Sequence, residues 1–260
     1  MMDHFKFGDG ARTLVILPGL SIQSIMGYAD AIAEAYRIFT EDFTVYVLDR
    51  RSELPPTYTV YDTARDTAAA IRALGLERVS LFGASYGGMA AAVIAAQQPE
   101  LVERMVLAAT SARVTQEEFE TIGGWLRLAR EGDAEGLSLA FGEALYPKET
   151  FDASRDLLID AAKTVTAEEL RRFIVLAEGI RGFDVTDCLD RIQCPVLAIG
   201  DRQDQVLGAA AMERLTRAME RRADFEAYMY DGYGHAVYDM APDFKERMLR
   251  FLMKDKEIAR

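Results

Sequence analysis

Short apolar runs alternate with longer segments of helical spacing along most of this chain. The apolar runs predict strands at residues 5–7, 13–17, 43–48, 79–82, 104–109, 195–200 and 225–230. Helices are expected between them, at residues 28–38, 59–74, 88–96, 209–220 and 242–253. Nearly continuous apolar strands that alternate with helices are typical of a parallel sheet covered on both faces. The predicted fold class is therefore α/β, with a mostly parallel, doubly wound sheet.

The first two strands flank Gly8-Asp9-Gly10, a sequence typical of a turn. Two strands joined by so short a glycine-rich segment favour a hairpin. We therefore expect residues 5–7 and 13–17 to pair with each other.

The alternation stops between residues 111 and 190, where helices are expected and no strand is evident. Thr115 with Glu118, and Thr166 with Glu169, match the capping box at the start of a helix. An all-helical insert between two strands of one sheet predicts a lid or cap. The predicted organisation is a core of residues 1–110 and 191–260, with a helical cap at residues 111–190.

Composition and charge narrow the function classes. The chain has 260 residues and a net charge of −12, which argues against nucleic acid and anionic membranes as partners because both would be repelled. The two cysteines, Cys188 and Cys194, form no zinc-type or C-x-x-C pattern. The N-terminus lacks an apolar core of signal-peptide length, and no run reaches the length of a membrane span. These features predict a cytoplasmic protein.

The most informative motif is Gly83-Ala84-Ser85-Tyr86-Gly87, which lies between a predicted strand and a predicted helix of small residues. In this context the short G-x-S-x-G pattern predicts a nucleophile elbow, a sharp turn that points the serine hydroxyl outward. Small residues are needed at both glycine positions because the chain packs closely there. Ser85 is the candidate nucleophile.

A serine hydroxyl needs an adjacent base, and the chain contains two histidines. His4 lies in the first predicted strand and is expected to be a solvated strand residue. His235 lies in a glycine-rich loop, Asp231 to Ala236, between the last strand and the last helix. Such a loop can project an imidazole over the elbow, so His235 is the candidate base.

The imidazole in turn needs a carboxylate to orient it. Asp201 and Asp204 both follow the strand that ends at Gly200. A carboxylate several residues past the strand can reach back beneath the histidine loop, whereas one directly after the strand more often caps the turn. Asp204 is therefore the predicted acid, and Asp201 is the alternative.

An oxyanion hole requires two backbone N–H donors. One is expected from Tyr86, directly after the nucleophile. The other is expected from Leu20, in the loop Pro18-Gly19-Leu20 that follows the second strand. Pro18 makes this loop rigid, and Gly19 allows its backbone to approach a substrate.

Together these residues resemble the α/β-hydrolase fold superfamily, in particular its capped serine hydrolases of the carboxylesterase kind. The resemblance rests on Pro18-Gly19-Leu20, the elbow, the Asp204 turn and Gly234-His235, in the chain order serine, acid, histidine. Many relatives have His-Gly where this chain has Pro18-Gly19. The resemblance implies hydrolysis without a metal or organic cofactor. The serine at the elbow disfavours epoxide and haloalkane hydrolysis, which use an aspartate there.

The sequence thus predicts a serine hydrolase acting on a small-molecule acyl substrate, most simply a small or medium neutral ester. Amide, thioester and C–C bond hydrolysis remain open, as does a ligand receptor that retains the fold. Trp125, the single tryptophan, lies in the first predicted cap helix. It is expected either to roof the substrate cavity or to pack the cap against the core. The oligomeric state is left open.

Overall fold

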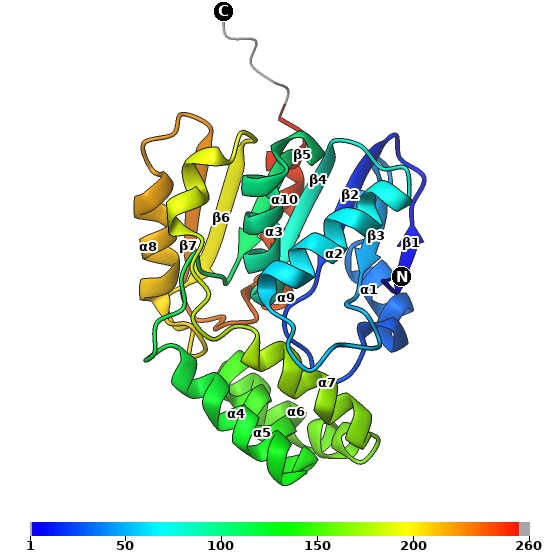
Figure 1. Ribbon diagram of the computed structural model, residues 1–260, viewed down its shortest axis with the longest axis vertical. Coiled ribbons are helices and arrows are strands. Elements are labelled where there is room, and N and C mark those ends of the chain that lie inside the picture. Colours follow the sequence, from blue (N-terminus) through cyan, green and yellow to red (C-terminus); the bar gives the residue numbers. More distant parts are fainter. Residues whose placement is uncertain (1, 255–260) are drawn as a thin grey trace, which may run out of the picture.

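A seven-stranded sheet forms the centre of the structure, a computed structural model that describes residues 2–254 (Figure 1). Its strand order is β1-β3-β2-β4-β5-β6-β7. Strand β1 runs antiparallel to β3, and the remaining neighbours are parallel. The mostly parallel α/β sheet predicted from the sequence is confirmed. The strands are β1 (His4–Phe7), β2 (Arg12–Leu17), β3 (Phe43–Leu48), β4 (Val79–Ala84), β5 (Val102–Ala108), β6 (Val196–Asp201) and β7 (Phe225–Tyr230).

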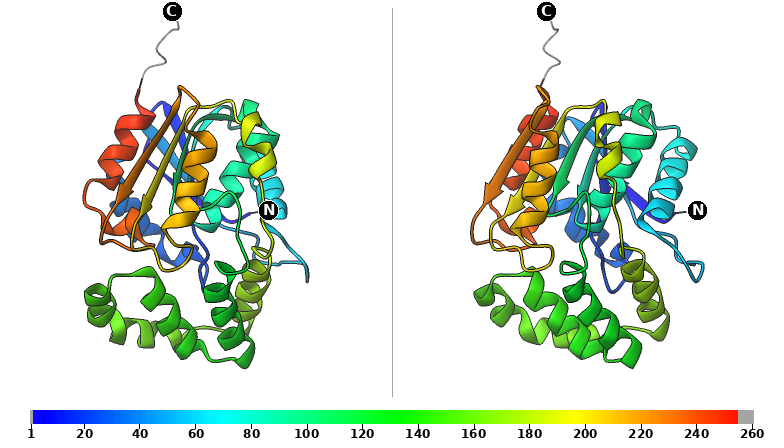
Figure 2. Two further views of the ribbon diagram at one scale, coloured as in Figure 1. Left: turned by 90° about the vertical axis from the view of Figure 1, so that its left-hand side faces the viewer. Right: turned by 60° about the vertical axis from the view of Figure 1, so that its left-hand side comes forward.

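Helices cover both faces of the sheet (Figure 2). Helices α2, α3 and α8 pack on one face, and α1 and α10 pack on the other. Within residues 2–254, no helix is long and apolar enough to cross a membrane; the cytoplasmic location stays a prediction. The helices are α1 (Ala29–Ala35), α2 (Val60–Ala73), α3 (Tyr86–Gln97), α4 (Phe119–Glu131), α5 (Ala134–Leu145), α6 (Lys148–Ala162), α7 (Ala167–Glu178), α8 (Ala209–Met219), α9 (Val237–Met240) and α10 (Phe244–Leu252).

The core lies on both sides of the sheet because its central strands are apolar on both faces. In β2, Val15 and Leu17 pack against the α2–α3–α8 side, while Leu14 and Ile16 pack against the α1–α10 side. Successive side chains of a strand point to opposite faces, so a strand buried on both faces must be continuously apolar. This double burial fixes β2 and β4 in the middle of the sheet.

The predicted hairpin between the first two strands is wrong. Strand β1 pairs with β3 instead, with His4 opposite Leu48 and Phe7 opposite Val45. Both edges of β2 are already occupied, by β3 and β4. The chain therefore carries β1 past β2 to the outer edge of β3, and Gly8 makes the bend with a φ of 74° that favours glycine.

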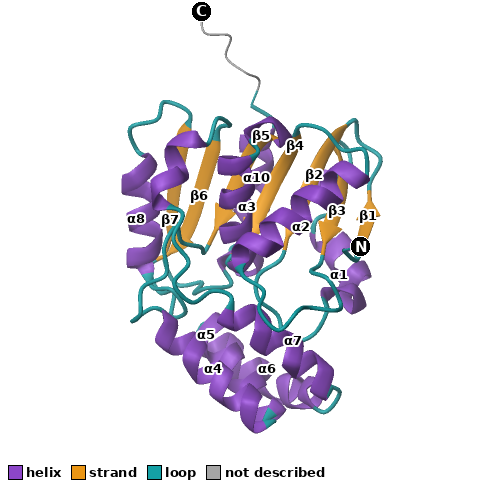
Figure 3. Cartoon of the chain, viewed as in Figure 1, coloured by secondary structure: helices purple, strands orange, loops and turns teal. Residues whose placement is uncertain are grey.

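Helices α4 to α7 form a separate layer beyond the carboxyl ends of the parallel strands. Loops lie between this layer and the sheet (Figure 3). The predicted capping box of Thr166 and Glu169 is present at the start of α7. Thr115 and Glu118 also exchange reciprocal bonds, but α4 begins at Phe119 and not directly after Thr115, so this pair lies just before the helix. The position of the layer suits a cap, and the division into core and cap stays a prediction.

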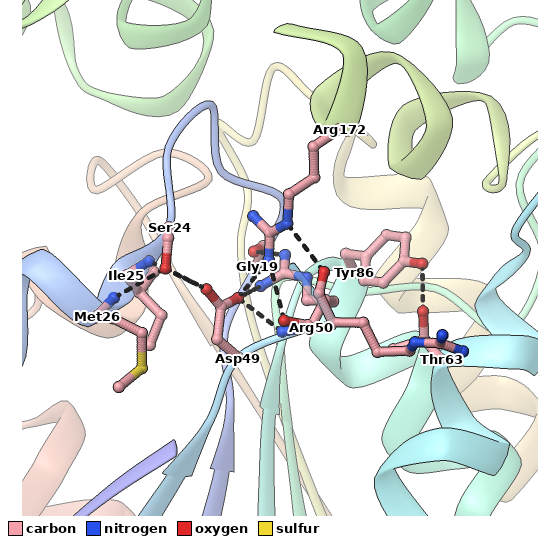
Figure 4. Close-up of polar contacts among 10 residues, drawn as sticks. Gly19, Ser24, Ile25, Met26, Asp49, Arg50, Thr63, Tyr86 and Arg172 are labelled. Carbon is pink, nitrogen blue, oxygen red and sulfur yellow. Dashed lines mark hydrogen bonds and ion pairs between the residues drawn. The ribbon is translucent and has the colours of Figure 1, made fainter. Parts of the chain in front are cut away.

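A buried ionic cluster joins this helical layer to the core (Figure 4). Asp49 and Arg50 follow directly after β3, and Arg172 extends from α7. Arg172 Nη2 lies 3.0 Å from Asp49 Oδ1, and Arg50 Nη1 lies 3.4 Å from the same oxygen. Ser24 Oγ donates to the other oxygen of Asp49 at 2.7 Å. The cluster therefore holds two arginines around one carboxylate, with almost no access to solvent.

Asp49→Asn is expected to lower the free energy of unfolding at pH 7 by about 3 kcal/mol or more, because it leaves two buried guanidinium groups without a counter-charge. Burial alone would raise the pKa of Asp49, but Arg50, Arg172 and the Ser24 hydroxyl lower it. A carboxyl whose pKa is lowered by folding stabilises the fold above its unfolded pKa of about 3.9 and loses this effect as the pH falls through its folded pKa.

The difference between wild type and Asp49→Asn should therefore be constant from about pH 7 to 5 and shrink below about pH 4. Urea unfolding at several pH values measures it. Glu34→Gln, which removes an exposed ion pair with Arg37, is the control and should leave stability within experimental error. A difference that does not change with pH would contradict the assigned role of the Asp49 charge.

Candidate functional site

Ser85 lies on a strained turn between β4 and α3. Its backbone has a φ of 51° and a ψ of −118°, which few residues other than glycine adopt. The turn is held by two bonds, from the Ser85 amide to the Ala108 carbonyl at 2.8 Å and from Thr110 Oγ1 to the Ser85 carbonyl at 2.7 Å. The surrounding structure thus compensates for the strain and presents the hydroxyl at the carboxyl edge of the sheet.

The two glycines of the motif are required by space. A Cβ on Gly87 would lie 2.1 Å from the Leu17 carbonyl oxygen, and one on Gly83 would lie 2.4 Å from the Gly87 carbonyl oxygen. Both distances are far below van der Waals contact. The helix can therefore approach β2 and β4 only with glycine at these positions.

The structure brings Ser85, His235 and Asp204 together in one chain of hydrogen bonds. His235 Nε2 lies 2.8 Å from Ser85 Oγ, and His235 Nδ1 lies 2.8 Å from Asp204 Oδ2. His235 is 2% exposed, so little water competes for these contacts. This is the geometry in which a histidine can accept the serine proton while a carboxylate holds the ring.

Asp204 is held in its ionised form. Its second oxygen, Oδ1, accepts the backbone N–H groups of Val206 at 2.8 Å and Leu207 at 3.1 Å. Burial alone would raise the pKa of Asp204, but His235 and these two amides lower it below its ordinary value. An ionised carboxylate at this point favours a proton on His235 Nδ1, which leaves Nε2 free to face Ser85.

Asp201, the alternative acid, is engaged elsewhere. One of its oxygens accepts the Gln203 amide at 2.7 Å, and the other accepts the Tyr233 amide at 2.9 Å. The second bond ties the end of β6 to the loop that carries His235. Asp201 therefore shapes the histidine loop without touching the imidazole.

The helical layer of α4 to α7 also contacts the histidine loop, residues 231–236. Gly234 has a φ of 68°, and a Cβ there would lie 3.0 Å from the Leu145 carbonyl oxygen. The Ala236 amide donates to that same oxygen at 3.0 Å. Since Leu145 is the last residue of α5, the end of a helix of this layer directly supports the backbone around His235. His4, in contrast, lies in the edge strand β1, where its ring contacts the Met2 carbonyl.

The loop after β2 passes close to the nucleophile. A Cβ on Gly19 would lie 3.4 Å from Ser85 Cβ, and both Gly19 and Leu20 line the cavity above Ser85. Among the described residues, no acceptor occupies the amide of Leu20 or that of Tyr86. Both amides are therefore available to a ligand, as an oxyanion hole requires.

The cavity above Ser85 is small and mostly apolar. Its free volume is about 20 Å³, which is space for one or two water molecules. Ser85, His235 and Tyr238 supply its polar side chains, and apolar side chains supply most of the wall. The apolar lining comes from Met89, Ile122, Trp125, Phe141, Leu145, Ile180, Val206 and Leu207.

Two contacts near the site were not predicted from the sequence. Thr110 stabilises the turn through the Ser85 carbonyl, and Arg50 donates to the Gly19 carbonyl. A signal for Arg50 was present, because an Asp-Arg pair directly after a buried strand lies at the carboxyl edge of a parallel sheet, where such sites form. No signal for Thr110 is evident in the sequence.

Comparisons with curated proteins place relatives along nearly the whole chain. A protein of Rhizobium rhizogenes named "Putative carbamate hydrolase RutD" is 23% identical over 257 residues, which cover 95% of each chain. The human "Serine hydrolase BPHL" is 26% identical over 215 residues, which cover 79% of this chain and 68% of the human one. Both relatives are named as hydrolases, and the name of the first also states a substrate class, carbamates.

A comparison with solved structures gives the same fold. MGS-M2, an α/β hydrolase enzyme from a Medee basin deep-sea metagenome library, superposes with a TM-score of 0.84 at 22% identity, over 98% of this chain and 96% of the other. The family model of the α/β hydrolase fold matches residues 13–242. This match spans the elbow, the helical layer and the histidine loop, so the chain belongs to the α/β-hydrolase family and is a hydrolase.

Proposed function

We propose that the protein is a serine hydrolase that cleaves small or medium neutral acyl esters through an acyl-enzyme intermediate. The observation that carries the proposal is the unbroken hydrogen-bond chain from Ser85 through His235 to Asp204, beneath an apolar cavity. The wall of that cavity contains no Asp, Glu, Lys or Arg side chain among the described residues. Such a wall suits an uncharged acyl group.

In this mechanism Ser85 Oγ attacks the ester carbonyl while His235 Nε2 accepts the serine proton. The carbonyl oxygen becomes an oxyanion, which accepts hydrogen bonds from the amides of Leu20 and Tyr86. The C–O bond to the alcohol then breaks, and His235 returns the proton to the leaving alcohol. Asp204 stabilises the imidazolium while it exists.

A water molecule completes the cycle. His235 removes a proton from this water as it attacks the acyl-enzyme carbonyl, and a second oxyanion forms in the same hole. The bond to Ser85 Oγ breaks, and His235 returns the proton to the serine. The products are the carboxylic acid and the alcohol.

The test is a panel of substrates that differ in the type of bond to be cleaved. An ester, an amide and a thioester of butyrate, together with an alkyl carbamate, are each incubated with wild type and Ser85→Ala. The ester should have the largest kcat/KM, and Ser85→Ala should abolish its turnover. Preferred cleavage of the amide, thioester or carbamate would redirect the substrate assignment. A wild type no faster than Ser85→Ala on every substrate would favour a ligand receptor.

We also propose that α4 to α7 act as a cap that selects the acyl chain, with Trp125 as part of its inner wall. Trp125 lines the cavity from α4, and its ring centroid lies 4.6 Å from that of Phe141. Trp125→Ala should change the ratio of kcat/KM between octanoyl and acetyl esters by about tenfold, because several methylene contacts are altered.

Fluorescence provides a second measurement on the wild type. Trp125 is the single tryptophan, so its emission should shift when a serine-directed phosphonate fills the cavity. The matched control for Trp125→Ala is Leu126→Ala, since Leu126 is buried on the same helix but does not line the cavity.

If Trp125→Ala lowers kcat/KM equally for all acyl lengths, and the wild-type emission does not change, Trp125 only packs the helices together.

A further inference from the structure

We propose that Arg50 is a positioning residue of the oxyanion hole, which sets the direction of the Leu20 N–H. This inference rests on the proposed serine hydrolase function. Arg50 Nη2 donates to the Gly19 carbonyl (Figure 4). The Gly19 carbonyl and the Leu20 N–H belong to one peptide unit, and no cis peptide bond occurs among the described residues.

In a planar trans peptide, the C=O and N–H groups point in opposite directions. An arginine that holds the Gly19 oxygen on one side therefore turns the Leu20 N–H to the other side. Gly19 and Leu20 both border the cavity that contains Ser85. Without this anchor, the peptide could rotate and remove one of the two donors from the hole, since glycine offers little resistance to rotation.

Arg50 is itself rigidly placed. Its guanidinium is buried, bonds to Asp49 Oδ1, and lies 5.3 Å from the centroid of the Tyr86 ring. The Tyr86 hydroxyl is fixed by Thr63 Oγ1 at 2.6 Å. One side chain thus contacts both residues whose amides form the hole, Leu20 through its peptide and Tyr86 through its ring.

The charge of the cluster supports the same role. Two arginines surround the single carboxylate of Asp49, so the cluster carries one positive charge in excess. Arg50 Nε and Arg172 Nη1 are buried and have no hydrogen-bond partner among the described residues. An unbalanced, buried positive charge behind the hole favours negative charge inside it, because little solvent screens the interaction.

The test compares Arg50→Met with wild type, using p-nitrophenyl butyrate and a pair of inhibitors. A trifluoromethyl alkyl ketone forms an oxyanion on the serine, whereas the methyl ketone of the same chain length binds largely as the uncharged ketone. Loss of one oxyanion donor costs about 10²-fold or more in rate. Arg50→Met should therefore lower kcat/KM about 100-fold and weaken the trifluoromethyl ketone similarly, while the methyl ketone changes less than about threefold.

The matched control is Arg104→Met. Arg104 is also buried, donates to a backbone carbonyl, that of Lys254, and lies 5.7 Å from the ring centroid of Phe251. It sits near the start of β5, away from the elbow, so its loss should affect stability and leave both inhibitor constants unchanged.

If Arg50→Met does not fold, Arg50→Lys serves as the test variant, because one ammonium cannot replace both bonds of the guanidinium. It should weaken the trifluoromethyl ketone about tenfold and leave the methyl ketone unchanged.

Equal weakening of both ketones, or no change in either, would overturn the role of Arg50. That outcome is distinct from failure of the proposed function. In the latter case the wild type itself would neither cleave p-nitrophenyl butyrate nor bind the trifluoromethyl ketone more tightly than its methyl counterpart.

Discussion

Ser85→Ala is expected to lower kcat for p-nitrophenyl butyrate by about 10⁴-fold or more, because the members of a nucleophile–base–acid unit act together and Ser85 Oγ is the hydroxyl that contacts His235 Nε2. The variant should fold normally. The substitution removes only Oγ, and the bonds that hold the turn involve the Ser85 backbone. Thermal unfolding followed by circular dichroism checks this.

A serine-directed phosphonate should add once to the wild type, and peptide mass spectrometry should place it on Ser85. Ser80→Ala is the matched control, since Ser80 is buried on β4, the strand that leads into the Ser85 turn, but does not line the cavity. Its labelling and turnover should equal those of wild type. A label on another residue, or more than about one hundredth of the activity remaining in Ser85→Ala, would refute the assignment.

Asp204→Asn should cost on the order of 10⁴ in kcat while leaving the fold intact. The reason lies in the contacts of the side chain. The Val206 and Leu207 amides hold Oδ1, so asparagine should keep its oxygen there and turn its NH₂ group toward His235 Nδ1. That group donates, which forces the imidazole proton onto Nε2. The histidine can then no longer accept the proton of Ser85.

Asp201→Asn is the matched control for Asp204→Asn. Asp201 accepts the amides of Gln203 and Tyr233 and does not contact the imidazole. Asparagine can satisfy one of those amides, so we expect a loss of about tenfold or less through a looser histidine loop. Reversal of the two effects would transfer the orienting role to Asp201. Initial rates and thermal unfolding of both variants suffice.

Features set by local sequence were predictable. The elbow depends on Gly83, Ser85 and Gly87, whose steric requirements act within a few residues of one another. Helix α2 begins after Thr59, whose capping box with Asp62 is encoded in four residues. The order Ser85, Asp204, His235 could be predicted because each follows a recognisable strand.

Features set by distant contacts were not predictable in the same way. Strand β1 pairs with β3 and not with β2, because the partners of β2 come from residues far along the chain. The anchor between Arg50 and Gly19 joins positions 31 residues apart, and that between Arg172 and Asp49 joins positions 123 residues apart. The pattern of apolar residues does not specify which charged residue meets which carbonyl.

The hydrogen bond between the Ala236 amide and the Leu145 carbonyl has a consequence for substrate entry. A cavity of about 20 Å³ is too small for an ester such as p-nitrophenyl butyrate, so substrate entry requires some part of its wall to move. A movement that displaces the end of α5 would stretch this bond or carry the backbone next to His235 with it. Entry by this route would therefore disturb the position of the proton acceptor, and closure over the substrate would restore it. Full reactivity of Ser85 would then depend on a substrate that allows this wall to close.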